Sequence, residues 1–321
     1  MTIKPQFNEV VSLAKKHYQV EASEVSLLRK GIDNDLFVIK NKDNKFVMRV
    51  GKRKLGEMVE YEIKLLNHLY KADVLVPRII PTIDKKYFIL QENGTAILCF
   101  EFIQGHSLEV SDEKKPSIKI VKQAGEALGK FHQASISFKF NYSKRRTIYS
   151  EFERILDIKN RFEEKVEGFK KFLNEINAYI DWSHQEHGKH GVIHNDFGPE
   201  NVMVKNNNLT SIIDFDWAGP GPFAKDVGLA VALWSYPDGL EGHWQDVVDE
   251  FLYGYNKHSP TQLEFNHKLI KWINFCCLSD TATFFADLPE DNKKIIRVTQ
   301  CQRYKKFLYF EKLLDGINAS K

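Results

Sequence analysis

One stretch decides the fold of this chain: His194-Asn195-Asp196-Phe197-Gly198-Pro199-Glu200-Asn201, followed by Ile213-Asp214-Phe215-Asp216. An Asp that can accept a proton comes first, then an Asn and a second Asp that can bind a metal. This order is typical of phosphoryl transfer, in which catalysis consists mainly of positioning and charge neutralisation. The spacing therefore predicts Asp196 as the catalytic base, and Asn201 and Asp214 as ligands of Mg²⁺.

A hairpin would bring these polar side chains together. Val202–Val204 and Ser211–Ile213 have the composition of short strands, and the asparagines at 206–208 form a turn signal between them. Antiparallel pairing across that turn would set Asn201 beside Asp214, and a carboxamide next to a carboxylate suits a hard cation. The alternative, an Asn- and Asp-rich surface turn, does not explain why residue type, order and spacing agree.

The composition is that of an ordinary globular protein. The chain has 321 residues, of which 43% are hydrophobic and 28% charged, and its net charge is +3. So small a charge does not favour nucleic acid as a partner, and no apolar stretch is long enough to span a bilayer. The N-terminus lacks an apolar signal core and the cysteines lack metal-ligand spacing, so we expect a cytoplasmic protein with reduced thiols. These cysteines are Cys99, Cys276, Cys277 and Cys301.

The first hundred residues have the pattern of an amphipathic helix followed by an antiparallel sheet with one internal helix. Asn93-Gly94 is the strongest hairpin signal in this part of the chain. The predicted helices are 6–20 and 55–70, and the predicted strands are 25–28, 36–39, 46–50, 87–91 and 95–102.

Helical spacing dominates beyond Gly105. Helices are predicted at 116–132, at 151–182 as one or two helices, and at 247–255, 269–283 and 295–314. The chain is therefore predicted to be α+β, with a small antiparallel β-sheet lobe at residues 1–103 and a large, mainly helical lobe at 104–321 that carries the chemistry.

Phosphoryl transfer needs a cation for the nucleotide phosphates and an acid that holds the cation in place. The third predicted strand offers Arg49, and the following helix offers Glu62, with Glu57 and Glu60 as weaker candidates. Arg can bind phosphate bidentately, although it is not equivalent to the Lys of the template. The alternative is an edge-strand Arg that faces water. The loop Gly31–Phe37 has a single glycine and supports phosphate binding only weakly.

The chain resembles the aminoglycoside phosphotransferase / choline kinase-like family of small-molecule kinases, distant relatives of protein kinases. The most specific parts are His194–Asn201 and Ile213–Asp226, which contains the run Ile213-Asp214-Phe215-Asp216-Trp217-Ala218-Gly219-Pro220-Gly221. The resemblance covers nearly the whole chain. It implies a bilobal, protein-kinase-like fold with a nucleotide-binding lobe at 1–103 and a catalytic and substrate lobe at 104–321.

The resemblance also implies a role for each matching residue. Asp196 would act as the base or orient the acceptor hydroxyl, Asn201 and Asp214 would bind Mg²⁺, and ATP or GTP would be the donor. Because a free Asp has a pKa of about 4, we expect Asp196 to be ionised and to act mainly by orienting the hydroxyl. The other implied roles are adenine contacts by backbone groups of Glu101 and Ile103 near Phe100, and support of the loop that contains Asp196 (the catalytic loop). Asp226 would brace this loop, and His194 would support it structurally.

Two features argue against a protein as the acceptor. Gly198 stands where protein kinases carry a Lys, and the short span from Asp214 to Asp226 has no A-P-E motif and no room for an activation segment. Asp216 replaces the Gly of D-F-G, and it would either add an outer metal contact or cap the turn.

Two further groups of side chains have possible binding roles. Histidines crowd positions 184, 187, 190 and 194, but this spacing is not H-E-x-x-H and glycines interrupt it, so a zinc site is not favoured. Acidic and aromatic residues mingle between Trp234 and Glu250, and Asp280 follows in a predicted helix. Such side chains can bind a cationic substrate, although core and surface roles explain each of them as well.

The sequence therefore predicts a cytoplasmic, Mg²⁺-dependent kinase that transfers the γ-phosphate of ATP or GTP to a hydroxyl of a small molecule. An aminoglycoside-type antibiotic and an amino alcohol such as choline are the leading acceptors, and homoserine, a thio-sugar or a vitamin stay open. The alternative is a nucleotide-binding, pseudokinase-like regulatory module, against which the joint presence of Asp196, Asn201 and Asp214 argues. A protein Ser/Thr kinase is less favoured.

Overall fold

The computed structural model describes residues 4–31, 34–42, 44–54, 56–140, 147–290 and 294–319. The chain forms two compact units. Unit 1 comprises Met1–Gly105, Lys139–Tyr142 and Thr210–Ile213, and unit 2 comprises His106–Phe138, Ser143–Leu209 and Asp214–Lys321. Nucleotide binding by residues 1–103, and catalysis and substrate binding by residues 104–321, stay predictions.

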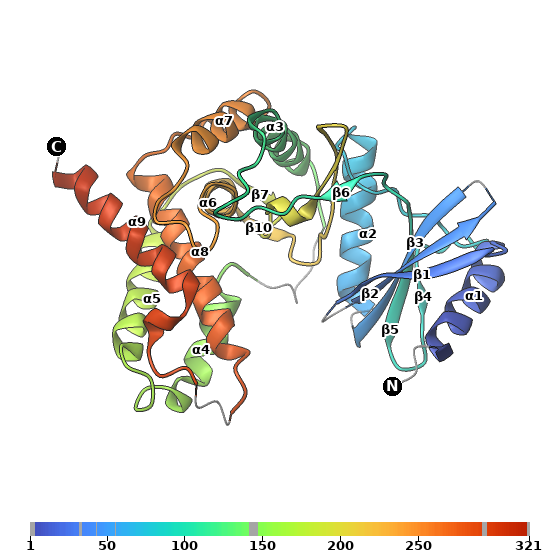
Figure 1. Cartoon of the computed structure of the whole chain (residues 1–321), viewed down its shortest axis with the longest axis horizontal. Helices are drawn as coiled ribbons and strands as arrows, with labels where there is room; N and C mark the ends of the chain where they lie inside the picture. The colour runs from blue at the N-terminus through green and yellow to red at the C-terminus, as the bar shows by residue number, and fades with distance from the viewer. Residues whose placement is uncertain are drawn as a thin grey trace. The chain divides into compact units, whose positions relative to one another are not determined.

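Unit 1 is built on an antiparallel, five-stranded sheet in the order β1-β2-β3-β5-β4 (Figure 1). All the strands predicted in this part are present, although β4 is shorter than expected. β4 and β5 form the hairpin expected at Asn93-Gly94, where Gly94 has a φ of +83°. The strands are β1 (Glu24–Lys30), β2 (Asn34–Asn41), β3 (Asn44–Lys54), β4 (Ile89–Leu90) and β5 (Thr95–Glu101).

Two helices, α1 (Lys4–Tyr18) and α2 (Gly56–Lys71), cover opposite faces of this sheet (Figure 1). Successive side chains of a strand point to opposite faces, so Met48 packs against α1 while Arg49 faces α2 and meets Glu62 there. The core on the α1 side contains Val10, Ala14, Phe37, Ile39, Met48 and Ile97.

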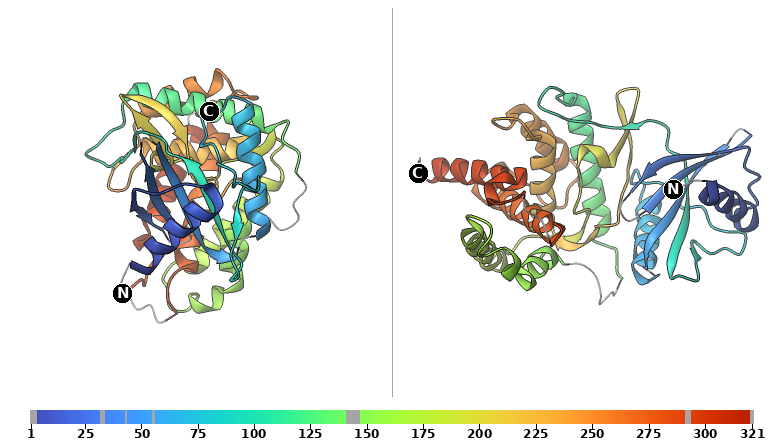
Figure 2. Two further views of the ribbon diagram at one scale, coloured as in Figure 1. Left: turned by 90° about the vertical axis from the view of Figure 1, so that its right-hand side faces the viewer. Right: turned by 60° about the horizontal axis from the view of Figure 1, so that its bottom comes forward.

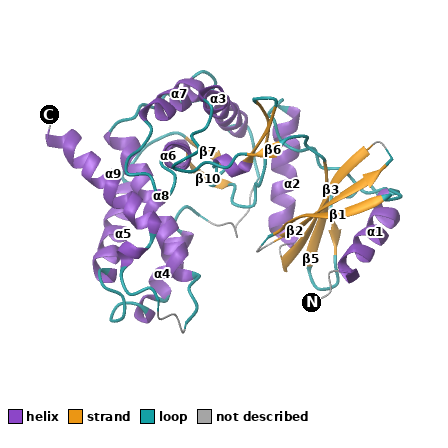
Figure 3. Cartoon of the chain, in the orientation of Figure 1, coloured by secondary structure: helices purple, strands orange, loops and turns teal. Residues whose placement is uncertain are grey.

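Unit 2 is mainly helical (Figure 3). Its helices are α3 (Ile118–Ser135), α4 (Ser150–Asp157), α5 (Phe169–His184), α6 (Phe223–Ser235), α7 (Gln245–Asn256), α8 (His267–Ala286) and α9 (Gln302–Ala319). The long α8 packs against α4, α5, α6 and α9, and α3 packs against α7. A Cβ atom at Gly125 of α3 would lie 2.1 Å from the backbone oxygen of Phe251, so the α3–α7 crossing requires glycine there.

The helices predicted from periodicity are present, with differences at two places. The region 151–182, predicted as one or two helices, forms two, α4 and α5, while α9 begins at Gln302 rather than at 295. α6 was not predicted, because its side chains are buried on nearly every side and so lack the apolar periodicity of a surface helix.

The remaining strands are short: β6 (His106–Ser107), β7 (His190–Ile193), β8 (Val202–Lys205), β9 (Asn208–Ile212) and β10 (Gly219–Pro222). They belong to unit 2, except that residues 210–212 of β9 belong to unit 1. β6, β8 and β9 form one sheet, and the β8–β9 hairpin is yellow in Figure 2. The predicted second strand of this hairpin ends at Ile212, one residue before its expected end. The antiparallel β7–β10 pair was not predicted, because Gly-Pro-Gly-Pro has the composition of a turn.

Among the residues that the structure describes, no helix has both the length and the apolar composition needed to cross a bilayer.

Candidate active site

The β7–β10 pair brings the two predicted site segments to one place. Ile193 at the end of β7 lies opposite Gly219 at the start of β10. The loop with Asp196 leaves β7 directly after Ile193, and the loop with Asp214 enters β10 directly before Gly219. The two segments are therefore joined by strand pairing as well as by the β8–β9 hairpin.

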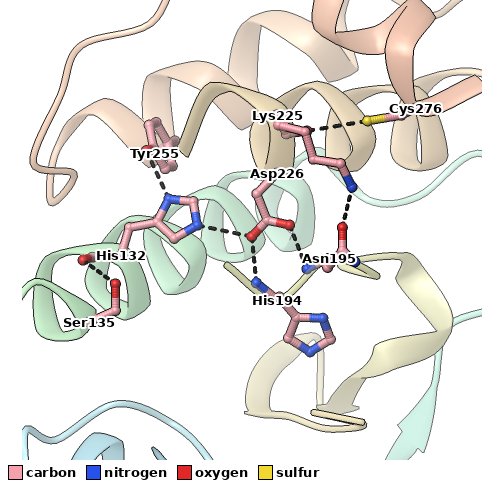
Figure 4. Close-up of polar contacts among 8 residues, drawn as sticks. All are labelled: His132, Ser135, His194, Asn195, Lys225, Asp226, Tyr255 and Cys276. Carbon is pink, nitrogen blue, oxygen red and sulfur yellow. Dashed lines mark hydrogen bonds and ion pairs between the residues drawn. The ribbon is translucent and has the colours of Figure 1, made fainter. Parts of the chain in front are cut away.

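Asp226, in the first turn of α6, supports the start of the catalytic loop (Figure 4). The backbone N–H groups of His194 and Asn195 donate to its two carboxylate oxygens over 2.8 and 2.7 Å, respectively. His132 on α3 donates from Nε2 over 2.9 Å, and its Nδ1 lies 3.0 Å from the hydroxyl of Tyr255. Burial alone would raise the pKa of Asp226, but the hydrogen bond from His132, together with the charge of Lys225, holds it below its usual value.

His132 is neutral at this site. Burial lowers the pKa of His132, although the hydrogen bond and charge of Asp226 oppose the shift. A neutral imidazole can donate from Nε2 to Asp226 while its Nδ1 accepts from the Tyr255 hydroxyl, which satisfies both ring nitrogens. The arrangement therefore combines a charged carboxylate, which accepts three N–H donors, with an uncharged histidine.

Two residues of the site have left-handed backbone conformations. φ is +67° at Asn195 and +65° at Asp214, a region that Asn and Asp tolerate better than most residues. The Asn195 carboxamide oxygen accepts a hydrogen bond from the ammonium of Lys225 (Figure 4). Fixed contacts therefore hold the backbone on the N-terminal side of Asp196 in a conformation that it would rarely adopt alone.

Asn201 lies against Asp196. Its Nδ2 donates to the backbone oxygen of Asp196 and to the Oδ2 of its carboxylate, each over 2.8 Å. With both amide hydrogens bonded to Asp196, the Asn201 oxygen is the atom that could contact a cation. The turn Pro199–Asn201 and the following β8 fix the buried Asn201 side chain in this position.

Negative charge is concentrated around Asp196. Burial, followed by the charges of Glu200, Asp214 and Asp280, raises the pKa of Asp196 to about 8, although the hydrogen bond from Asn201 lowers it. The expectation that this carboxyl is ionised with an ordinary pKa is therefore wrong for the protein without a cation.

A carboxamide oxygen and crowded carboxylates are the donor set that a hard divalent cation prefers, and its charge would offset their repulsion. The residues present thus fit Mg²⁺. The side chain of Asp214 is exposed and so accessible to an incoming ion.

Within the described residues, the histidines of positions 184–194 do not come together as a group of metal ligands. His190 is exposed and its Nδ1 lies 2.7 Å from the oxygen of Gly188, while His194 is fully buried beside the rings of Phe197 and Phe215. Nowhere in the described parts of the chain do three His, Cys, Asp or Glu side chains form a group that could hold a metal. A Mg²⁺ site formed by Asn201 and Asp214 would have a single carboxylate ligand, so it does not belong to such groups of three side chains.

In unit 1, Arg49 and Glu62 form a buried, bidentate ion pair. Arg49 Nη1 donates to Glu62 Oε1 over 2.8 Å, and Nη2 donates to Oε2. Because Arg49 is only 9% exposed, the alternative of an edge-strand Arg that faces water is wrong. Its guanidinium also lies 5.4 Å from the ring centroid of Phe100. Glu60 is exposed, and the side chain of Glu57 lies outside the described residues.

The residues predicted to contact the adenine are only partly available for a nucleotide base. The N–H of Glu101 donates to the oxygen of Arg78 over 2.9 Å, so the carbonyl of Glu101, rather than its N–H, is the group that could meet an adenine. Ile103 follows β5 in a segment without regular structure. The predicted phosphate loop Gly31–Phe37 lies partly outside the described residues.

A cavity of about 190 Å³ in unit 2 lies beside the candidate base. Its lining includes Asp196, Glu151, Asp280 and Lys225, with the hydroxyl side chains of Ser279 and Thr283 among its polar groups. Burial raises the pKa of Asp280 against the opposing charges of Arg303, Lys225 and Lys306. The cavity therefore holds several carboxylates and one ammonium next to the position expected for chemistry.

A larger cavity, of about 670 Å³, lies in unit 1 and is lined by Ile63 of α2 and by Tyr87. Of the residues predicted for the site, its lining includes only the weaker candidate Glu60, so its greater size does not make it the candidate active site.

Sequence reasoning missed several residues of the site. His132, Tyr255 and Glu151 come from helices far from the motif in the sequence, whereas Lys225 directly precedes Asp226, but no local pattern distinguishes any of them. Within the predicted acidic and aromatic group, Trp234 is not available to a ligand, because it is fully buried and its Nε1 donates to the Phe197 oxygen. Of that group of candidates, Asp280 is the one that lines the cavity.

Comparison with known sequences points to one family. A family model described as "Phosphotransferase enzyme family" matches residues 24–260, which is more than half of the chain. The homoserine kinase of Rhodopseudomonas palustris (strain BisA53) is 24% identical over 239 residues, or 73% of this chain and 70% of that relative. Against the homoserine kinases of Rhizobium meliloti (strain 1021) and Sinorhizobium medicae (strain WSM419), the match spans 63% of their own length.

Solved structures share the fold. An amicoumacin kinase in complex with AMP-PNP, Ca²⁺ and Ami has a TM-score of 0.72 and 14% identity, covering 98% of this chain and 96% of that chain. A microcompartment-associated aminopropanol kinase has a TM-score of 0.67 and 17% identity, covering 96% of this chain and 95% of that chain. The chain therefore belongs to the phosphotransferase enzyme family and is a small-molecule phosphotransferase with the predicted protein-kinase-like fold.

Proposed function

We propose that this chain transfers the γ-phosphate of ATP or GTP to the hydroxyl group of a small molecule that also carries an amine. The observation that supports this most directly is the cavity beside Asp196, in which a candidate base is combined with the carboxylates of Glu151 and Asp280. Carboxylates that surround a buried site favour a positively charged ligand.

Residues of unit 2 would carry the chemistry. Asp196 would orient the acceptor hydroxyl and receive its proton, while Asn201 and Asp214 would hold Mg²⁺. When bound, Mg²⁺ supplies neutralisation of the phosphate charge. Asp226 and His194 would keep the catalytic loop in position, the former through its bonds to the backbone of that loop.

Residues of unit 1 would bind the nucleotide. Arg49, oriented by its bidentate contact with Glu62, would bind the phosphates. The Glu101 carbonyl and the Ile103 N–H would contact the base, with Phe100 beside it. These assignments follow the family resemblance, and the fixed orientation of the Arg49 guanidinium supports the first of them.

The size of the cavity favours a small acceptor. Pockets for drug-sized ligands usually measure about 300–1,000 Å³, whereas this one measures about 190 Å³. We therefore favour an amino alcohol or a hydroxy amino acid over an aminoglycoside with several rings. Relatives named homoserine kinase and a structural neighbour named aminopropanol kinase act on compounds of this size.

A screen for nucleotide consumption tests the proposal. Amino alcohols, hydroxy amino acids and aminoglycosides would be offered with Mg²⁺ and either ATP or GTP, and release of the nucleoside diphosphate would be measured. We expect turnover with a small amine-bearing alcohol and its loss in Asp196→Asn. Turnover that persists in this variant would contradict the mechanism, and tight binding of Mg-nucleotide without any turnover would favour the regulatory module.

A further inference from the structure

Lys225 is the one cation that lines the cavity beside Asp196, as far as the described residues show. It lies in the first turn of α6, next to Asp226, and only 4% of its surface is exposed. The proposed mechanism gives it no role. A buried lysine requires an explanation, because removing an ammonium group from water is costly unless it is paired or well hydrogen-bonded.

The neighbours of this ammonium compensate it only in part. Its hydrogen-bond partner is the carboxamide oxygen of Asn195, which is neutral (Figure 4). No carboxylate of the described residues forms an ion pair with it, although its charge acts on Asp280 and on Asp226. An ammonium has three donors, so Lys225 can still donate to an anionic group that enters the cavity.

Two carboxylates of the cavity, Glu151 and Asp280, each lie close to an arginine of the protein. Glu151 Oε2 accepts hydrogen bonds from Arg154 and from Thr283, each over 3.2 Å. Asp280 Oδ2 lies 3.8 Å from Arg303 Nε. A ligand with one ammonium and one carboxylate could therefore place each group against its opposite, with a hydroxyl left for Asp196.

We propose that Lys225 binds the carboxylate of the acceptor, and that the acceptor is consequently a small hydroxy amino acid rather than an amino alcohol. This inference rests on the proposed function, because it assumes that the cavity binds the acceptor. An amino alcohol lacks the group that Lys225 would recognise, and its ammonium would be repelled by that of Lys225. Lys225 would thus be the residue that determines specificity between the two classes.

Two pairs of probe compounds isolate the carboxylate. L-Serine differs from ethanolamine, and L-homoserine from 3-aminopropan-1-ol, only by that group. For each pair, the ratio of kcat/KM values between the amino acid and the amino alcohol would be measured in the wild type, Lys225→Met, Lys225→Arg and Lys189→Met. The exposed Lys189 donates to a backbone oxygen and is the matched control. Using a ratio cancels any general effect that loss of the Asn195 contact has on the catalytic loop.

We expect a wild-type preference for at least one of the amino acids, and a fall in that ratio by about 10- to 100-fold in Lys225→Met, the range typical for a lost charge-assisted contact. Lys225→Arg should retain part of the preference, and Lys189→Met all of it. The nucleotide KM and the unfolding midpoint would be recorded for every variant.

Other results would overturn the inference in distinct ways. Equal loss with both members of a pair, together with a raised nucleotide KM, would assign Lys225 to a phosphate instead. Efficient wild-type turnover of amino alcohols alone would refute the inference and leave the proposed function intact. Absence of turnover with every amine-bearing alcohol would refute both.

Discussion

The carboxylate of Asp226 lies 2.7 Å from the backbone nitrogen of Asn195, the residue that precedes the candidate base. This contact joins the first turn of α6 to the catalytic loop. The same carboxylate accepts from His194 N and from His132 Nε2, so one buried side chain links α3, α6 and the loop.

Asp226→Asn should weaken both stability and activity. An amide has one acceptor oxygen and would turn its NH₂ group toward a backbone N–H, which leaves buried donors unpaired. We expect the free energy of unfolding to fall by about 3 kcal/mol and kcat to fall by about 100-fold. Chemical denaturation and steady-state kinetics would measure these effects. The control is Asp246→Asn, at an exposed pair with Lys115, for which we expect almost no change.

Acidification should destabilise the protein through His132. The pKa of His132 is lowered by burial in the folded state, whereas an unfolded His has a pKa of about 6.5. Below that value the unfolded state binds a proton that the folded state does not, so stability falls as pH falls. Asp226, whose folded pKa is lowered, acts in the same direction in a more acidic range. The unfolding midpoint of His132→Gln should therefore vary less between pH 7 and pH 5 than that of the wild type, and an identical variation would argue against a neutral His132.

Cation binding should release a proton from Asp196. With a pKa of about 8, this carboxyl is mostly protonated at pH 7, and a divalent cation nearby would lower its pKa. We expect Mg²⁺-nucleotide binding at pH 7 to release up to about one proton from this site. Calorimetry in buffers with different ionisation enthalpies would measure the release. The same measurement on Asp196→Asn should lack this component, and an equal release in the variant would assign the proton to another group.

Asn201→Ala should raise the Mg²⁺ requirement. The variant loses the proposed oxygen ligand as well as the two hydrogen bonds that Nδ2 donates to Asp196. We expect the Mg²⁺ concentration for half-maximal activity to rise by about 10-fold or more, and kcat to fall as well. Asn208→Ala, at the exposed first residue of β9, is the control. An unchanged Mg²⁺ dependence in Asn201→Ala would contradict its assignment as a ligand.

Substitution of Arg49 should affect the nucleotide and not the acceptor. Arg49→Lys keeps the charge but loses the bidentate contact with Glu62, so the KM for nucleotide should rise by several-fold. Arg49→Met should raise it further and also destabilise unit 1, because the buried Glu62 would lose its bidentate contact with a cation. Arg29→Met, at an exposed position of β1, serves as the control. If the nucleotide KM stayed constant in both Arg49 variants, the pair would be purely structural.

Much of the fold was predictable because its signals are local. The strands of unit 1, the Asn93-Gly94 hairpin and most helices of unit 2 follow from side-chain periodicity and turn residues within short windows. α6 and the β7–β10 pair were missed for the same reason: a helix that is buried all round has no periodicity, and a Gly-Pro strand shows its pairing only in three dimensions.

The sequence by itself determined the order of the site. Asp196 and Asn201 lie on one short loop with Asp214 a hairpin away, and this contiguous motif was sufficient to predict phosphoryl transfer to a small molecule. The motif determines which chemical groups are present. It also keeps them near one another, because residues close in sequence cannot lie far apart in space.

Only the tertiary structure decided how those groups behave. The raised pKa of Asp196 depends on burial and on charges that include the distant Asp280. The partner of Asp226, His132, is 94 residues away in the sequence. Lys225 lines the cavity because it lies in the first turn of α6, which Asp226 bonds to the catalytic loop. The burial of a group and the electrostatic field that acts on it depend on all its neighbours in space. Both are therefore determined only by the packed structure.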